Sequence, residues 1–132
     1  MRSLKVTLAC LVAFAMVAGV AIAQEGFPLT GSWLGDWGPN TTTRNPAFIV
    51  LDWDGRSISG TLNPGTDNIP LQNATLTTPW LVHFEAEARD RSGATVRYVI
   101  DGKIENVGLA NRAIVGTWTV GTTKNDFRIA RQ

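Results

Sequence analysis

The stretch Trp80-Leu81-Val82-His83-Phe84-Glu85-Ala86-Glu87-Ala88 decides the fold class, because its side chains alternate in polarity with a period of two. Every second residue from Trp80 to Ala88 is apolar, and these residues share one face. His83, Glu85 and Glu87 share the other face with Leu81. A period of two is typical of a β-strand that has one face in a core and the other in water.

Short apolar segments of this kind continue along the chain, separated by Gly, Pro, Asn and Asp, and no helical period is visible beyond the N-terminal leader. The clearest turn is Asp54-Gly55, where glycine allows a tight hairpin. Eight short strands favour an all-β fold, an eight-stranded antiparallel up-and-down barrel, which leaves no exposed edges, and a two-sheet β-sandwich is the alternative. The strands are expected at 31–37, 47–53, 57–62, 69–76, 80–88, 95–104, 113–120 and 126–131.

The N-terminus has the three parts of an export signal. Arg2 and Lys5 form a positive start, residues 6–20 are an uncharged apolar run, and Ala21-Ile22-Ala23 is a small-residue cleavage site. Residues 1–23 are therefore predicted to be a signal peptide, and residues 24–132 a single β-barrel domain. We expect a secreted or periplasmic protein with no membrane span after cleavage.

The composition of residues 24–132 bears on the possible partners of the domain and on what stabilises it. Of the 12 Lys and Arg residues, Arg2 and Lys5 belong to the leader. The remaining ten are nearly balanced by 11 Asp and Glu residues, and both signs are scattered along the chain. This balance argues against a nucleic-acid partner. Cys10, the single cysteine, also belongs to the leader, so stability has to come from packing and strand pairing without a disulfide.

Gly31-Ser32-Trp33 on the first strand, with the basic residues Arg128 and Arg131 on the last, resembles the pattern of the calycins, the group of lipocalins and avidins. The chain is also similar to small exported bacterial β-barrel proteins that share a Gly-x-Trp start, a late Gly-Thr-Trp and a final Phe-x-Ile/Leu-x-Arg strand. The resemblance implies a barrel with a concave end for a small apolar molecule. It also implies that Trp33 packs under Arg131 or Arg128 as a structural closure.

Five tryptophans, Trp33, Trp37, Trp53, Trp80 and Trp118, are the most distinctive feature of the composition. Large rings fill the interior of a small barrel, so Trp33, Trp80 and Trp118 are predicted to lie in the core. Trp37 precedes a loop, and Trp53 ends a strand that is apolar on both faces. A strand of that kind is covered on its second side or exposes a binding patch.

Two hypotheses for function follow. The first is a small apolar ligand bound at the open end of the barrel, oriented by polar loop residues. The second is a structural or accessory module that binds a carbohydrate or a partner protein through surface tryptophans, Trp53 or Trp37. The candidate ligand-binding residues are Trp37, Asn40, Arg44, Asn45, Trp53, Val82, Phe84 and Tyr98.

The sequence contains no catalytic constellation that we recognise. Its one histidine, His83, shares a strand face with Glu85 and Glu87, a set that could bind a metal, but a solvated strand face predicts the same residues. Asp52-Trp53-Asp54-Gly55 lacks the downstream carboxylates of a calcium loop and is interpreted as a hairpin. We therefore expect a protein that is not an enzyme and has no cofactor and no metal.

Overall fold

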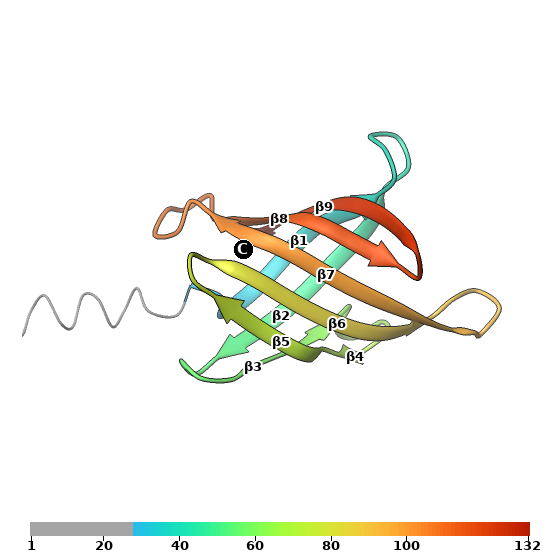
Figure 1. Cartoon of the computed structure of the whole chain (residues 1–132), viewed down its shortest axis with the longest axis horizontal. Coiled ribbons are helices and arrows are strands. Elements are labelled where there is room, and N and C mark those ends of the chain that lie inside the picture. Colours follow the sequence, from blue (N-terminus) through green and yellow to red (C-terminus); the bar gives the residue numbers. More distant parts are fainter. Residues whose placement is uncertain (1–27) are drawn as a thin grey trace, which may run out of the picture.

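The computed structural model describes residues 28–132, so the predicted leader lies outside the described residues. One antiparallel sheet, with strand order β4-β3-β2-β1-β9-β8-β7-β6-β5, curls into a nearly closed barrel (Figure 1). Within the described residues there is no helix, and hence no helix long and apolar enough to cross a membrane. The strands are β1 (Gly31–Gly38), β2 (Asn45–Trp53), β3 (Ile58–Leu62), β4 (Ile69–Pro70), β5 (Gln72–Thr77), β6 (Leu81–Arg89), β7 (Thr95–Glu105), β8 (Ala113–Val120) and β9 (Thr123–Arg131).

The predicted all-β barrel is confirmed, but it has nine strands instead of eight, because the segment expected at 69–76 divides at Leu71. Its first part, β4, pairs with β3, and its second part, β5, pairs with β6. The backbone N–H of Leu71 donates to the carbonyl of Gly60 at 3.0 Å. Pro70 has no N–H with which to continue the first ladder. This bent segment, residues 69–77, contains both outer strands of the sheet and so links β3 to β6.

Two other strands begin earlier than expected. β9 starts at Thr123 instead of 126, because Gly121, with a φ of 59°, makes a two-residue turn that lets residues 123–125 pair with the end of β8. β2 starts at Asn45 instead of 47, because Asn45 pairs with Trp37 on β1. The predicted Asp54-Gly55 hairpin is confirmed between β2 and β3, and the Asp54 carboxylate accepts the N–H groups of Arg56 and Ser57.

The core is made of the inward faces of the strands, as the alternating pattern predicts. Trp33, Phe84 and Trp118 are completely buried. Trp80 was expected among them, and this prediction is wrong: its side chain is 36% exposed, and its φ is 66° in the turn that precedes β6. The turn after Pro79 takes Trp80 out of the strand, so the inward alternation starts only at Val82.

The end of the barrel at which β1 begins is covered by packed side chains and by side-chain hydrogen bonds to the backbone. Trp33 Nε1 donates to the carbonyl of the buried Leu29 at 2.8 Å, and Arg131 Nε donates to the carbonyl of Thr30 at 2.8 Å. Trp33 and Arg131 lie opposite each other in the β1–β9 ladder. Gly31, at φ 134°, leaves the space that Arg131 fills, since a Cβ there would lie 2.3 Å from its Nε.

Arg128, the alternative partner for Trp33, lies on the outer wall. Its guanidinium is 3.6 Å from the carboxylate of Glu105 on β7, and its side chain is more than half exposed. The alternation of the strand explains the difference, because Arg131 is an odd number of residues from Arg128 and so points to the opposite face.

The approach of the bent segment to β3 leads to a first prediction. A Cβ on Gly60 would lie 2.5 Å from the carbonyl oxygen of Val50 and 3.0 Å from side-chain carbons of Leu51 and Leu71. Gly60→Ala is therefore expected to lower the free energy of unfolding by about 1–3 kcal/mol, the usual cost of overpacking. Ser59→Ala, at the exposed neighbouring position, is the control and should stay close to wild type in urea unfolding. Equal stability of the two variants would contradict the close approach.

Candidate functional site

The antiparallel course of the strands gives the barrel two ends with different loops. We call one the Trp37 end; it is formed by residues 39–44, 63–68, 90–94 and 121–122. We call the other the Trp80 end; it is formed by residues 28–30, 54–57, 78–80 and 106–112. The sequence-predicted ligand residues divide between the two ends and the core, so each group is described separately.

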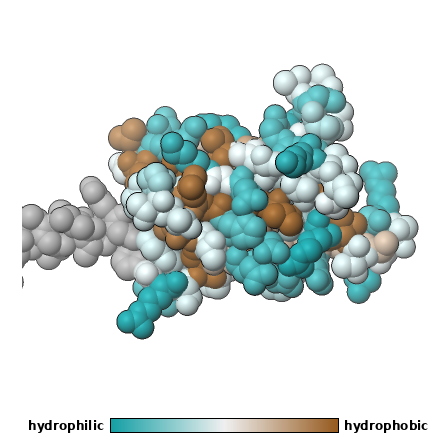
Figure 2. Space-filling view, viewed as in Figure 1, coloured by the Kyte–Doolittle hydropathy of each residue, from teal (hydrophilic) through white to brown (hydrophobic). Residues whose placement is uncertain are grey.

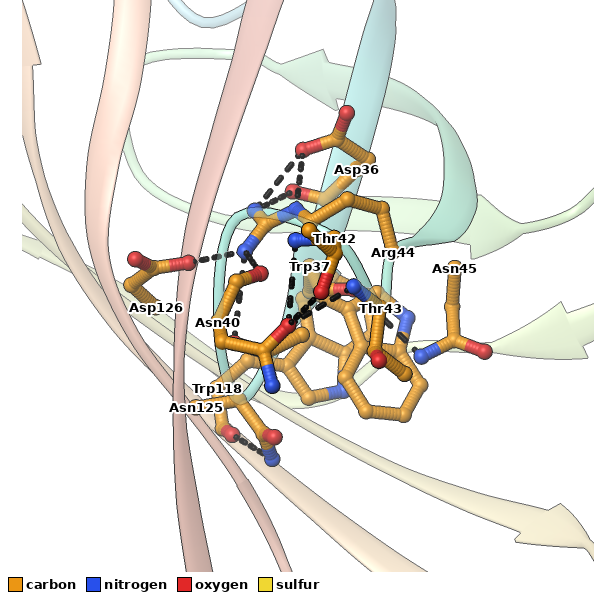
Figure 3. A network of polar contacts seen from close by, with 11 residues as sticks. Asp36, Trp37, Asn40, Thr42, Thr43, Arg44, Asn45, Trp118, Asn125 and Asp126 are labelled. Carbon is orange, nitrogen blue, oxygen red and sulfur yellow. Dashed lines mark hydrogen bonds and ion pairs between the residues drawn. The ribbon is translucent and has the colours of Figure 1, made fainter.

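Aromatic rings fill the barrel at the Trp37 end. Trp37 and Trp118 are stacked nearly parallel, with ring centroids 5.3 Å apart and an interplanar angle of 5° (Figure 3). Tyr98 meets both rings edge-on, at 5.7 Å from Trp37 and 5.4 Å from Trp118. Phe127 completes the cluster at 5.9 Å from Trp118. One flat face of Trp37 is thus covered by Trp118.

The backbone of Trp118 is held by Asn125, the one buried polar residue among those described, whose Nδ2 donates to the Trp118 carbonyl at 3.0 Å. The indole Nε1 of Trp118 is itself buried and has no hydrogen-bond partner within the described residues. An unpaired buried donor of this kind costs about 1–3 kcal/mol.

Asn40 and Arg44, which are predicted to orient a guest, form hydrogen bonds within and beside their own loop (Figure 3). Asn40 Oδ1 accepts the backbone N–H groups of Thr42 and Thr43 at 3.0 and 2.8 Å. Arg44 forms ion pairs with Asp126 and, at 2.8 Å, with Asp36. The hydrogen bond to Asp126, followed by that to Asp36, raises the pKa of its guanidinium. Asn45 Nδ2 lies 3.4 Å from the Trp37 carbonyl. These polar groups tie the 39–44 loop to β1 and β9.

A cleft of about 420 Å³ opens at the Trp37 end, between the 63–68 loop and the last residues of β6. Its apolar lining comes from Tyr98, Ala88 and Ile69. Burial, and next the charge of Asp67, raise the pKa of the Tyr98 phenol, which therefore stays neutral at physiological pH. The polar lining consists of Asn63, Thr66, Asp67, Asn68, Glu87 and Arg89, and Pro70 completes the wall.

The 63–68 loop that forms one wall of this cleft is held by its own hydrogen bonds. Asn63 has a φ of 49° and donates through Nδ2 to Asp67 at 2.8 Å, while Asn68, with a φ of 51°, accepts the N–H of Gly65 at 2.7 Å. Residues 63–68 are not among the predicted ligand-binding residues. Asparagine tolerates positive φ, so the pair of asparagines around Pro64-Gly65 was the signal that could have indicated an ordered loop.

Val82 and Phe84, two further predicted ligand residues, belong to the packed core. They are 3% and 0% exposed and do not line the cleft at the Trp37 end. Of the predicted set, only Tyr98 lines that cleft. An eight- to nine-stranded barrel is narrow enough to be filled by side chains, and here it is filled by rings and branched aliphatic residues.

Trp53 lies at the opposite end of the barrel. It lines a second, mainly apolar cleft of about 370 Å³ together with Leu76, Thr77, Thr78, Pro79 and Trp80. The backbone of Trp53 is fixed to the N-terminal segment, since its N–H donates to Thr30 Oγ1 at 3.1 Å. The structure therefore separates Trp37 and Trp53, which the sequence analysis had grouped as two candidate binding residues.

His83 lies on the outer wall between two carboxylates. Its Nδ1 is 2.6 Å from Asp101 and its Nε2 is 2.9 Å from Glu85, so both contacts are hydrogen bonds only when the imidazole carries both protons. The hydrogen bond to Asp101, followed by that to Glu85, raises the pKa of His83. The His83 hydrogen bond and Arg97, 2.6 Å away, lower the pKa of Glu85 to about 2.

This outer-wall network is an ion-pair ladder across β6 and β7. Glu87 belongs to it through an ion pair with Arg97, whose guanidinium lies 3.2 Å from the Glu87 carboxylate. The carboxylates that His83 contacts are those of Asp101 and Glu85, whereas the metal hypothesis requires Glu85 and Glu87. Within residues 28–132 no group of three or more His, Cys, Asp or Glu side chains is placed to hold a metal ion.

Comparison with known proteins returned no match to a family model, to a curated protein or to a solved structure. The resemblance to calycins therefore stays a prediction from short motifs.

The His83 network leads to a second prediction. Because the folded pKa of His83 is above the unfolded value, its contribution to stability is complete below about pH 6.5 and is lost as the pH rises through the folded pKa. Glu85 acts in the opposite sense, losing its contribution as the pH falls from about 4.5 towards 2. The stability advantage of wild type over His83→Gln should therefore be largest between these limits.

Urea unfolding at a series of pH values measures this difference. Thr75→Ala, at the position opposite His83 in the β5–β6 ladder, is the control because threonine does not titrate in this range. Its difference from wild type should not vary with pH. If the difference in the free energy of unfolding between wild type and His83→Gln also does not change above about pH 6.5, the arrangement of His83 between two carboxylates is refuted.

Proposed function

We propose that this protein is an exported barrel that binds a small molecule, without catalysis, in the cleft at the Trp37 end. The observation that carries the proposal is the form of this cleft: about 420 Å³ at the mouth of the barrel, with Tyr98, Ala88 and Ile69 as apolar lining and polar residues around them. Small-molecule sites commonly have this size. This cleft is lined mainly by polar residues, so the guest it supports is one that makes several polar contacts besides its contact with Tyr98.

The lining indicates the chemistry of the guest. Tyr98 offers an aromatic surface, and Asp67, Asn68, Glu87 and Arg89 offer both donors and acceptors. A compact ring compound with polar substituents complements this arrangement better than a purely aliphatic molecule. Because ring packing fills the interior below Tyr98, the guest sits at the mouth and does not enter the barrel.

The proposal modifies the original hypothesis in two respects. The expected guest is amphipathic instead of apolar, and Asn40 and Arg44 support the 39–44 loop instead of orienting the guest. In the alternative, a module that binds a carbohydrate or a partner protein through surface tryptophans, one face of Trp37 is already occupied by Trp118. The alternative retains Trp53 and the apolar cleft at the Trp80 end.

Filling the cleft tests the proposal. Ala88 is 5% exposed and lines the cleft, so Ala88→Leu places three more carbons in the space for a guest. With 1-anilinonaphthalene-8-sulfonate as a probe, the variant is expected to lose at least about tenfold in affinity, measured by fluorescence titration. Ala94→Leu, the same change on the exposed 90–94 loop of the same end, is the control and should bind as wild type does.

Urea unfolding of both variants separates a blocked cleft from a damaged fold. Native mass spectrometry of the protein recovered from the exporting cells adds an independent readout, because a retained guest appears as extra mass that is lost on denaturation. Equal dye affinity for folded Ala88→Leu and wild type would refute the proposed site. Binding of soluble glycans that Ala88→Leu leaves unchanged would instead favour the surface-tryptophan alternative.

A further inference from the structure

The cleft of about 370 Å³ at the Trp80 end differs in chemistry from the cleft beside Tyr98. It is lined by two indole rings, two aliphatic side chains and two threonines, namely Trp53, Trp80, Leu76, Pro79, Thr77 and Thr78. Of these, only the threonines are polar, and no charged side chain among the described residues lines this cleft. The lining is therefore apolar, partly aromatic and without charge.

Hydrogen bonds from other segments fix the backbone at both indoles. Thr30 Oγ1 accepts the N–H of Trp53 at 3.1 Å and donates to the carbonyl of Trp53 at 3.4 Å. The carbonyl of Trp80 accepts the N–H of Ile104, on β7, at 2.9 Å. The segments that carry the two rings are therefore held in place without a guest. Such preorganisation lowers the ordering cost of binding.

Trp80 has a backbone conformation that bulky residues rarely adopt. Its φ is 66°, in the left-handed region. Within residues 28–132, the other non-glycine residues with positive φ are all asparagines, which tolerate this region: Asn63, Asn68, Asn73 and Asn106. Strain at a bulky residue persists only where its surroundings impose it, and it clusters at ligand sites. The strained turn takes Trp80 out of the core and places it in the wall of the cleft.

The lining selects the class of guest. Aromatic rings pack against indoles by stacking or by edge contact. A charged group would lose hydration in this cleft without gaining a charged partner. A sugar would need hydrogen-bond partners for several hydroxyl groups, and among the described residues no carboxylate or amide side chain lines the cleft. A neutral, mostly apolar ring compound therefore complements this lining best.

The two ends of the barrel offer different surroundings to a guest. In Figure 2, hydrophobic residues gather towards the Trp80 end, whereas the loops of the Trp37 end are mostly hydrophilic or intermediate. The cleft beside Tyr98 has the charged residues Asp67, Glu87 and Arg89 in its lining. No residue lines both clefts. An uncharged apolar compound and a polar one should thus prefer opposite ends.

We propose that the cleft between Trp53 and Trp80 is a second binding site, which takes a neutral, mostly apolar ring compound in contact with both indoles. Its volume lies within the range of small-molecule sites. The strained turn at Trp80 holds one aromatic wall of this site, and the end of β2 holds the other. The second site does not depend on the site at the Trp37 end.

Fluorescence titration with N-phenyl-1-naphthylamine, an uncharged aromatic dye, tests the second site, using protein recovered from exporting cells. Trp80→Asn removes the ring and introduces a residue type that tolerates a φ of 66°, so the variant should fold. It should bind the dye at least about tenfold more weakly than wild type. Trp80→Phe, which keeps an aromatic ring, is the matched control and should bind nearly as wild type does. Urea unfolding checks that both variants are folded.

A second readout locates the guest without a change in the cleft. Indole, a neutral and soluble ring compound, is added to the nitrogen-15-labelled wild-type protein, and the side-chain N–H signals of the tryptophans are followed by nuclear magnetic resonance. The signals of Trp53 and Trp80 should shift. The signal of Trp118, which is buried near the Trp37 end, should not. The Trp80 signal is assigned by its loss in Trp80→Phe.

Several results would overturn the second site. They are equal dye affinity of folded Trp80→Asn and wild type, no binding of the dye by wild type, and loss of the dye in Ala88→Leu, which would place it in the cleft beside Tyr98. If Trp80→Asn does not fold, the indole titration decides, and shifts that do not include Trp53 and Trp80 overturn the site. Failure at the Trp37 end is distinct, because it appears as unchanged affinity of Ala88→Leu for 1-anilinonaphthalene-8-sulfonate.

Discussion

The closure of the sheet by residues 69–77 is the constraint on which the rest of the structure depends. This segment pairs with β3 before Leu71 and with β6 after it, so strands that would otherwise be open edges meet through one bent strand. Open edges attract further strands, and closure removes them. Closure also fixes the width of the barrel, and thereby the volume that the inward side chains have to fill.

The interior is filled by side chains, chiefly aromatic rings. Trp33 occupies the interior near the Trp80 end, while Trp37, Tyr98 and Trp118 pack against one another near the Trp37 end. A barrel of this width accommodates either side chains or one small ligand, and here side chains take the space. The cleft beside Tyr98 and the cleft between Trp53 and Trp80 therefore lie at the two ends and not in the interior.

The two ends differ in chemistry because their loops differ in composition. The 63–68 loop is rich in amide and carboxylate groups and folds on its own hydrogen bonds, so it forms a polar wall. The β5–β6 turn and the β7–β8 loop expose Trp80, Leu81 and Leu109 instead. At the Trp37 end, Arg44 has a structural role, because its ion pairs with Asp36 and Asp126 hold the 39–44 loop in place. Arg44 does not line the cleft beside Tyr98 or the cleft beside Trp53.

The sequence by itself determined the all-β fold, most strand positions and the burial of Trp33, Phe84 and Trp118, because a period of two makes one face of each strand apolar whatever its partners are. Only the tertiary structure decided that the segment at 69–77 pairs with two different strands, that Trp80 leaves the core and that Arg44 pairs with Asp126. These outcomes depend on which strands pair and on which carboxylates lie beside a loop. Such contacts join residues far apart along the chain, as between Arg44 and Asp126, and no local pattern encodes them.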